Sequence, residues 1–354
     1  MDKILLSVCI PAYNRPNELK KLLQSLGGET LTSCEIVVSE DCSPRRPEIE
    51  DVVRAFARSR PDVTLRYLSN IATLGYDGNL RRLIDIAEGE YCVFMGDDDL
   101  LVPGALKLLQ EAVRNTGVGV VLRAWRAVDK ETLAILHEHR YFSGDRFFDA
   151  GPQTVAAFFR RSVFISGLTI RRDAAARAAT SEYDGTLLYQ LHLVGTILLR
   201  MNGFYLSSPI ALNRQGGEHF FGSSDAERNR FEPGKLSPAH SLRFVEGLLR
   251  IAKGLDKAEV NKKLYDLILM DVSRSSLPLL AIQAKRLRKS EFAEYGRNLA
   301  SLGLGRSTLF WAYYFGLLIG GPHVCEAAVG AWVRIIGRTP VLAGTDGRVV
   351  PPVR

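Results

Sequence analysis

Several features are scarce in this chain of 354 residues. Its five cysteines form no Cys-x-x-Cys pair and show no zinc-ligand spacing, which argues against a zinc module or a disulfide framework. The aromatic-rich apolar run at 309–319 has 11 residues, whereas a membrane-spanning helix needs about 20. No internal repeat, low-complexity tract or signal peptide is recognisable. These absences predict a protein of the reducing cytoplasm.

The composition is sufficient for a full core. With 46% apolar residues, a chain of this length can bury an α/β core and an appended smaller region. Cys9, Cys34 and Cys92 fall in predicted core strands, where we expect them to act as small buried hydrophobic residues.

Short apolar runs alternate with helical periodicity through the first hundred residues. Strands are predicted at 5–10, 34–39, 63–68 and 91–95, and helices at about 19–26, 49–56 and 77–87. Such repeated strand–helix units specify a mostly parallel sheet with helices on both faces.

Three consecutive carboxylates, Asp97, Asp98 and Asp99, follow the fourth apolar run. They would repel one another unless a cation lay among them. Mg²⁺ and Mn²⁺ take hard oxygen ligands and share them with substrate phosphates. The alternative is a solvated loop that caps the helix after Pro103. Because the triplet ends a predicted buried strand, we favour a metal site that holds a diphosphate.

Polar residues also follow the other predicted strands. Ligands of such sheets bind beyond the carboxyl ends of the strands. Those ends carry Tyr13 and Asn14, Asp41, and Asn70. We therefore expect one ligand-binding edge.

Together these segments resemble the family 2 glycosyltransferases of GT-A fold. The matching segments are 7–15, 35–43, Asn70 with Gly75 and Asn79, and 87–91 leading to the aspartates. The chain is more narrowly similar to O-antigen transferases of the abequosyltransferase kind, over roughly residues 4 to 220. The resemblance implies an inverting transfer from a nucleotide-activated sugar.

The resemblance also implies donor-binding residues. Pro11, Tyr13 and Arg15 would line the nucleoside pocket, and Asp41 would accept a hydrogen bond from the base edge. The family's paired acid is Glu40-Asp41 here, so a contact by Glu40 does not carry over.

Further along the chain, the resemblance places Asp97 at the ribose or donor sugar and Asp99 on the metal, and Asp98 could exchange with either. Asn70 and Asn79 would lie at the donor. Arg81 or Arg82 could bind phosphates from a helix, and one of the two is expected to be a solvated surface residue.

An inverting transfer needs a general base for the acceptor hydroxyl. The resemblance directs attention to Glu182 and Asp184, which precede a predicted buried helix and are separated by Tyr183. Asp184 is the first candidate and Glu182 the second. Asp184 could instead only cap the helix.

A Gly-rich loop follows the predicted strand at 203–210. Similar enzymes carry an Arg and a His there, which correspond to Arg214 and His219. His219 is a candidate third metal ligand, with a solvated loop histidine as the alternative.

The region from 236 onward is predicted to be helical and carries a basic cluster at 285–289. Basic residues beside the aromatic run suit an anionic membrane surface. A core or homodimer-interface helix explains the pattern equally well. Nucleic-acid binding lacks a recognised module.

These observations predict two regions. Residues 1–235 would form a GT-A domain, with a nucleotide-binding half at about 1–102 and an acceptor half at about 103–235, and 236–354 would form the helical region. We expect a Mn²⁺- or Mg²⁺-dependent transferase acting on a polyprenyl-diphosphate-linked glycan at the cytoplasmic face of the inner membrane. The alternatives are a protein or small-molecule acceptor, or a non-catalytic nucleotide-binding component.

Overall fold

A computed structural model describes residues 3–29, 31–216, 227, 237–257, 263–336 and 348–349, and side chains only up to 322. The chain divides into two compact units. The first comprises Met1–Gly234 with Asp346–Arg354, and the second comprises Lys235–Thr345.

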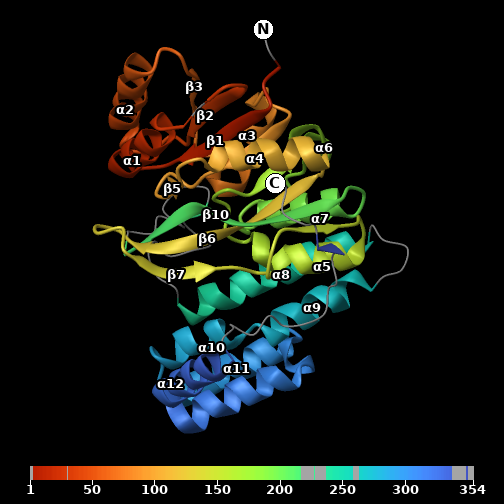
Figure 1. Ribbon diagram of the computed structural model, residues 1–354. Coiled ribbons are helices and arrows are strands. Elements are labelled where there is room, and N and C mark those ends of the chain that lie inside the picture. The colour runs from red at the N-terminus through yellow and green to blue at the C-terminus, as the bar shows by residue number, and fades with distance from the viewer. Residues whose placement is uncertain are drawn as a thin grey trace. The chain divides into compact units, whose positions relative to one another are not determined.

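The first unit is built on one mixed sheet of order β11-β8-β10-β6-β9-β4-β1-β2-β3 (Figure 1). In addition, β5 pairs with β10 and β7 pairs with β6. The strands are β1 (Leu6–Ala12), β2 (Cys34–Glu40), β3 (Thr64–Ser69), β4 (Tyr91–Phe94), β5 (Leu100–Leu101), β6 (Val120–Asp129), β7 (Ile135–His139), β8 (Arg146–Phe148), β9 (Thr169–Arg171), β10 (Gly203–Gln215) and β11 (Arg348–Val349). The block β4-β1-β2-β3 and the long β6–β10 pair are parallel, and the remaining pairings are antiparallel. The predicted α/β fold class is confirmed.

Helices cover both faces of the sheet. On one face, α1 (Pro16–Gly27), α2 (Arg46–Ser59) and α4 (Ala105–Thr116) share a core cluster with alternate β1 residues such as Val8 and Ile10. Successive side chains of a strand point to opposite faces, which places α3 (Gly75–Ile86) on the other face. There α3 contacts β1, β2, α6 (Arg172–Arg177) and α7 (Tyr189–Leu198). The short α5 (Pro152–Phe159) packs on α7 and leads into a 3₁₀ turn at Arg160–Ser162.

The predicted elements of the first hundred residues are confirmed to within two or three residues at each end. Cys9, Cys34 and Cys92 are buried free thiols, as expected. The apolar run at 163–170 predicts a further strand, and this prediction is wrong for most of its length. Only the three residues of β9 pair with β4 and β6, because the preceding segment forms turns that approach the end of β4.

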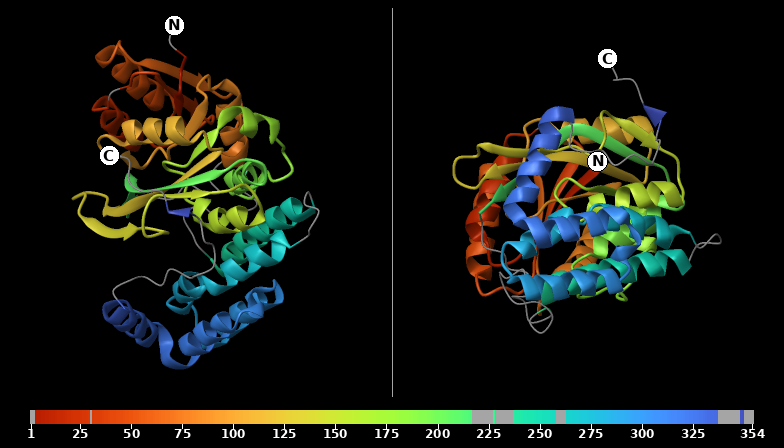
Figure 2. Two further views of the ribbon diagram at one scale, coloured as in Figure 1. Left: turned by 45° about the vertical axis from the view of Figure 1, so that its right-hand side comes forward. Right: turned by 90° about the horizontal axis from the view of Figure 1, so that it is seen from below.

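The described part of the second unit is helical. It comprises α8 (Pro238–Lys257), α9 (Leu264–Arg274), α10 (Leu277–Ala284), α11 (Lys289–Ser301), a 3₁₀ turn (Leu304–Arg306) and α12 (Thr308–Ile336). Helix α8 packs on α9, and α10 packs on α12 (Figure 2). Helix α12 kinks at Gly321 (φ 76°), followed by Pro322.

Among the described residues, no single helix has the length and hydropathy of a membrane span. The pair α9 and α10, bent by 44°, meets that test together by length and composition.

Candidate active site

The three aspartates begin directly after β4. Its last residue, Phe94, is followed by Met95 and Gly96, and a Cβ on Gly96 would lie 3.1 Å from Asp98 Oδ1 and 3.2 Å from Asp99 Oδ2. Both contacts are closer than an ordinary van der Waals contact. Glycine therefore lets the two carboxylates fold back against the backbone at the strand end.

Asp97 is held by the loop after β1. Its carboxylate accepts hydrogen bonds from Tyr13 N (3.1 Å) and Arg15 Nη1 (2.8 Å). Arg15 Nη1 also lies 3.0 Å from Asp98 Oδ2. Burial raises the pKa of Asp97 to about 6, although the Arg15 charge acts to lower it. The loop turns at Asn14, whose φ of 62° suits asparagine.

Asp99 is held by two residues far along the chain. It accepts hydrogen bonds from the Ser166 hydroxyl and from Asn213 Nδ2, the latter at 3.0 Å. Ser166 Oγ in turn accepts from Gly96 N at 2.9 Å. Burial and then the neighbouring Asp98 charge raise the pKa of Asp99 to about 8. Within the described residues, no lysine or arginine forms an ion pair with this carboxyl group.

The three aspartates suit a divalent cation whose coordination shell is completed by other ligands. No three His, Cys, Asp or Glu side chains converge on a closed metal site within the described ranges. Mg²⁺ typically uses one or two carboxylates and completes its shell with phosphate and water. Asp99 and the 34%-exposed Asp98 offer such oxygens, and the Arg15 guanidinium pairs with Asp97 and Asp98. A cation would relieve the charge that raises the pKa of Asp99.

The predicted donor residues Asp41, Asn70 and Asn79 form one buried network. Asp41 accepts hydrogen bonds from Asn70 Nδ2 (2.9 Å), Leu74 N (2.8 Å) and Gly75 N (2.9 Å). Asn79 accepts from Asn70 and donates to Ser39 O at 3.0 Å. This network ties the ends of β2 and β3 to the start of α3.

Glu40, the unusual member of the acid pair, is fully buried. It accepts hydrogen bonds from Cys42 N (3.1 Å), Ser43 N (2.7 Å) and Arg46 Nε (2.8 Å). The longer glutamate side chain thus supports the loop after β2.

Asp184 and Arg81 pair with each other. Two hydrogen bonds of 2.7 and 2.9 Å join the guanidinium to both carboxylate oxygens, and Arg81 Nη1 also donates to Thr180 O at 2.8 Å. The pair is partly exposed, at 25% for Arg81 and 38% for Asp184. Glu182 is exposed beside it.

The remaining predicted residues lie on several different elements. Pro11 lies near the end of β1 and has intermediate burial, and Arg82 is exposed on α3. Arg214, near the end of β10, is 6% exposed, and its three guanidinium nitrogens have no hydrogen-bond partner among the described residues. Burial acts to raise the pKa of Glu18, but a backbone hydrogen bond, Lys130 and, to a smaller extent, the Arg214 charge together lower it. His219 lies outside the described residues.

Three residues of the site were not predicted. Ser166 and Asn213 hold Asp99, and the fully buried Arg123 donates to Ser166 O (2.7 Å) and Phe164 O (2.5 Å). Burial lowers the pKa of Arg123 to about 10. In the sequence, the one indication of this role is that Arg123 follows the apolar residues 120–122. A charge in a buried strand is costly unless it has partners.

Several relatives with sequence similarity are named as glycosyltransferases. The abequosyltransferase RfbV of Salmonella typhimurium is 30% identical over 30% of this chain and 32% of its own. The GalNAc(5)-diNAcBac-PP-undecaprenol beta-1,3-glucosyltransferase of Campylobacter jejuni is 34% identical over 30% of this chain and 33% of its own. The chain thus aligns with about a third of the length of these relatives.

Solved structures share the fold over nearly the whole chain. S. aureus TarS 1-349 in complex with UDP-GlcNAc has a TM-score of 0.61 at 16% identity, over 95% of this chain and 93% of its own. The mannosyltransferase PcManGT of Pyrobaculum calidifontis, in complex with GDP-Man and Mn²⁺, has a TM-score of 0.51 at 14% identity, over 89% and 86%. The family described as Glycosyl transferase family 2 matches residues 7–177. Those residues are therefore a glycosyltransferase domain of family 2.

Proposed function

We propose that this protein is a metal-dependent, inverting glycosyltransferase with a nucleoside diphosphate sugar as donor. The observation that carries the proposal is the position of Asp97 and Asp99. Both are buried at the carboxyl end of β4, and burial raises the pKa of each. Several carboxylates at the carboxyl edge of the sheet can bind a divalent cation, which in turn binds a diphosphate. The TarS and PcManGT structures, which contain nucleotide sugars, support this reading.

Asp99 and Asp97, with Asp98 beside them, would hold the Mn²⁺ or Mg²⁺ ion, and His219 is proposed as a further ligand. The cation would stabilise the negative charge of the departing nucleoside diphosphate. Pro11, Tyr13 and Arg15 would line the nucleoside pocket from the loop after β1. The Asp41 network would form its wall, since Asp41, Asn70 and Asn79 are joined at the neighbouring strand ends.

The acceptor hydroxyl would attack the sugar carbon from the face opposite the diphosphate. A new glycosidic bond forms as the bond to the diphosphate oxygen breaks, and the hydroxyl proton passes to a base. Asp184 is our first candidate for that base and Glu182 the second. Because Arg81 occupies both oxygens of Asp184, this role requires the pair to open when substrates bind.

We propose a polyprenyl-diphosphate-linked oligosaccharide as acceptor, in cell-surface polysaccharide synthesis at the cytoplasmic face of the inner membrane. The relatives from Salmonella and Campylobacter support this class, and the second name specifies an undecaprenol-linked substrate. In this proposal residues 1–235 perform the transfer. The helical region 236–354 serves membrane association or dimer formation.

The first prediction tests the metal site. Asp99→Asn should abolish Mn²⁺-dependent stabilisation of the protein by nucleoside diphosphates and keep the fold, because it removes the buried anionic ligand. Thermal unfolding with UDP or GDP, with Mn²⁺ or chelator, measures this. Asp85→Asn, an exposed aspartate on α3, is the matched control. Equal metal-dependent stabilisation in both variants would remove Asp99 from the site.

Turnover assays on the same protein distinguish an enzyme from a non-catalytic nucleotide-binding component. The enzyme should hydrolyse or transfer a nucleotide sugar with Mn²⁺. Metal-dependent nucleotide binding without turnover on lipid-linked, protein and small-molecule acceptors would favour the non-catalytic alternative.

A further inference from the structure

The net positive charge of the chain lies in its second unit. Residues 235–345 contain 16 Lys and Arg against 8 Asp and Glu, whereas the whole chain has a net charge of +7. The first unit is therefore close to neutral. A local excess of one charge attracts ligands of the opposite charge, which directs attention to the cavities of the second unit.

One cavity of about 440 Å³ lies within that unit. It is lined by the exposed face of α8, by the start of α9 and by the end of α11. Ligand pockets usually measure about 300–1,000 Å³. Leu249, Leu302 and the ring of Tyr265 supply apolar wall, so the cavity is amphipathic.

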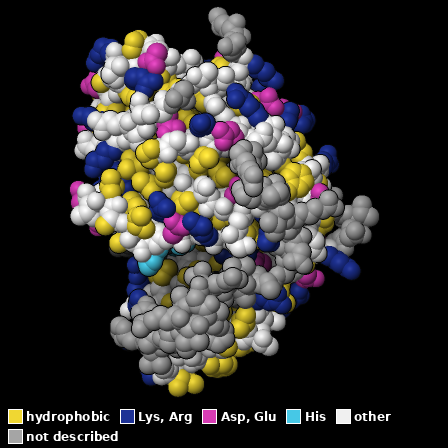
Figure 3. Space-filling view, in the orientation of Figure 1, with side chains coloured by type: hydrophobic (Ala, Val, Ile, Leu, Met, Phe, Trp, Pro, Cys, Tyr) yellow, Lys and Arg dark blue, Asp and Glu magenta, His cyan; other side chains and the backbone are white. Residues whose placement is uncertain are grey.

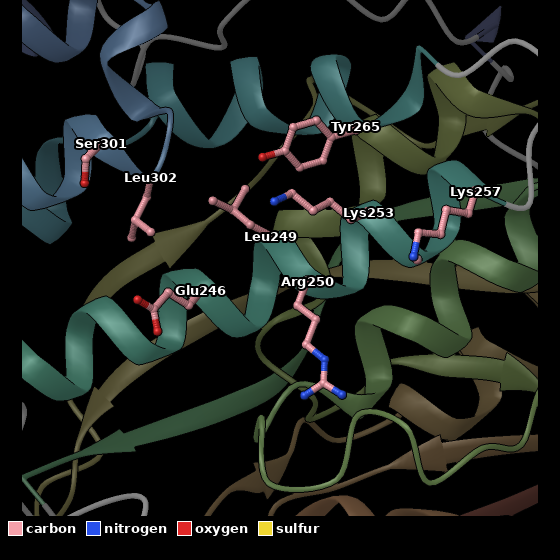
Figure 4. Close-up of a pocket in the computed structure, with 9 residues that line it drawn as sticks. Glu246, Leu249, Arg250, Lys253, Lys257, Tyr265, Ser301 and Leu302 are labelled. Carbon is pink, nitrogen blue, oxygen red and sulfur yellow. The ribbon is translucent and has the colours of Figure 1, made fainter.

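Helix periodicity places three cations on this wall. Arg250, Lys253 and Lys257 recur at spacings of three and four residues, which puts them on one helix face. They extend over about 10 Å at about 1.5 Å per residue. The one lining acid, Glu246, lies a turn before Arg250. Figure 4 shows its carboxylate at the end of the cavity away from the two lysines.

The lysines are available for a ligand. Neither Lys253 nor Lys257 forms an ion pair with any residue in the described ranges. Lys253 extends toward Tyr265, and its ammonium group lies 5.6 Å from the ring centroid (Figure 4). This cation–π contact orients the side chain before a ligand arrives, which lowers the entropic cost of binding.

We propose that this cavity is a binding site for a phosphate ester or diphosphate group. Several positive charges spread over a turn or two of helix match a ligand that carries more than one negative charge. The apolar wall and the volume suit a small or lipid-attached molecule. The site depends on no step of the glycosyl transfer.

Inorganic pyrophosphate is the first probe. Calorimetric titration of the full chain in EDTA prevents binding through a metal at the aspartates. Lys253→Gln/Lys257→Gln should weaken binding about tenfold or more, since it removes two charge-assisted contacts. Arg274→Gln/Arg297→Gln removes two exposed cations of the same unit outside the cavity and should change affinity less than about twofold. Equal weakening in both variants would overturn the site.

Two further arms identify the source of the ligand and separate this site from the donor edge. Flotation with neutral phosphatidylcholine vesicles, with and without phosphatidic acid, tests whether the cavity binds a phosphate that is attached to a lipid. Lys253- and Lys257-dependent flotation only with phosphatidic acid assigns the cavity to a lipid. Pyrophosphate binding without such flotation assigns it to a soluble ligand, and failure of both probes overturns the proposal.

Asp99→Asn should retain full pyrophosphate affinity in EDTA. Loss of binding in that variant would place the anion at the aspartates and overturn the cavity site. Both lysines are exposed, and among the described residues only the cation–π contact of Lys253 is lost. Their substitution should therefore lower the thermal unfolding temperature without ligand by no more than a few degrees, roughly, which checks that each variant is folded.

Discussion

At the scale of single residues, the aspartates at 97–99 differ in surroundings despite being adjacent. Asp97 is neutralised by Arg15, whereas Asp99 accepts hydrogen bonds from the neutral donors Ser166 and Asn213 and from the backbone of Arg214. A guanidinium stabilises a carboxylate more strongly than a hydroxyl or an amide does. This explains why the pKa of Asp99, at about 8, lies above that of Asp97, at about 6.

The second prediction distinguishes a catalytic from a structural Asp184. If Asp184 is the base, Asp184→Asn should lower turnover about 10²- to 10⁴-fold and leave donor affinity near wild type. Arg81→Met breaks the same ion pair but keeps the carboxylate, so it should retain most of the turnover.

Initial rates and donor titrations of these variants and of Glu182→Gln decide the question. Similar losses in Asp184→Asn and Arg81→Met, with matching drops in unfolding temperature, would make the pair structural. A large loss in Glu182→Gln alone would assign the base to Glu182.

At the scale of secondary-structure elements, local patterns predicted the strands that carry the site. The apolar run at 36–38 predicts β2, which lies between β1 and β3 and is buried at all seven positions. The support of Asp99 could not be predicted, because Ser166 and Asn213 are separated from it by 67 and 114 residues. The turn that presents Ser166 depends on Arg123, whose role appears only when β6 and that turn are packed together.

Helix α3 connects the two halves of the site. Its Asp77 is buried and accepts hydrogen bonds of 2.9 Å from Leu187 N and Tyr189 N, one turn before Arg81 pairs with Asp184. The loop that contains both base candidates is therefore anchored on the same helix whose start is held by Asp41.

The third prediction follows from Asp77. Burial raises its pKa to about 6 from the ordinary value of 3.8. The folded state thus holds this proton where the unfolded state has lost it. The stability from this group is fully present below about pH 4 and is lost as pH rises through about 6, with a slope of up to about 1.4 kcal/mol per pH unit.

Urea unfolding at several pH values between 4 and 7 measures this slope in the wild-type protein and in Asp77→Asn. The variant should lack the component, although its overall stability is lower because one backbone N–H loses its acceptor. An identical pH dependence in both proteins would contradict the assignment.

At the scale of the whole molecule, similarity in sequence and similarity in fold cover different parts of the chain. The family match ends at residue 177, whereas the shared fold with TarS extends over 95% of the chain. The helical unit has little sequence signal because amphipathic helices can exchange residues freely on their exposed faces. Its function must therefore be sought in charge and exposed apolar surface.

Both features are present near α10 to α12. Lys285, Arg286, Arg288 and Lys289 are exposed, and Arg288 pairs with Glu291 at 2.7 Å. Phe315 and Ile319 on α12 are 48% and 79% exposed. Hydrophobic side chains are visible at the lower edge of this unit in Figure 3. Large exposed apolar side chains beside cations suit a membrane surface or a second subunit.

The last prediction separates these two partners. A docked membrane surface would gain ~1 kcal/mol from each Lys or Arg near anionic lipid, and this attraction must weaken as salt rises. Flotation with anionic and neutral vesicles at two salt concentrations measures it. Replacing the four cations by Gln should weaken binding to anionic vesicles, and Ile319→Ser should weaken the part that persists at high salt. An intact protein that stays unbound at low salt and sediments as a stable dimer, which Ile319→Ser dissociates, would assign this surface to an oligomer interface.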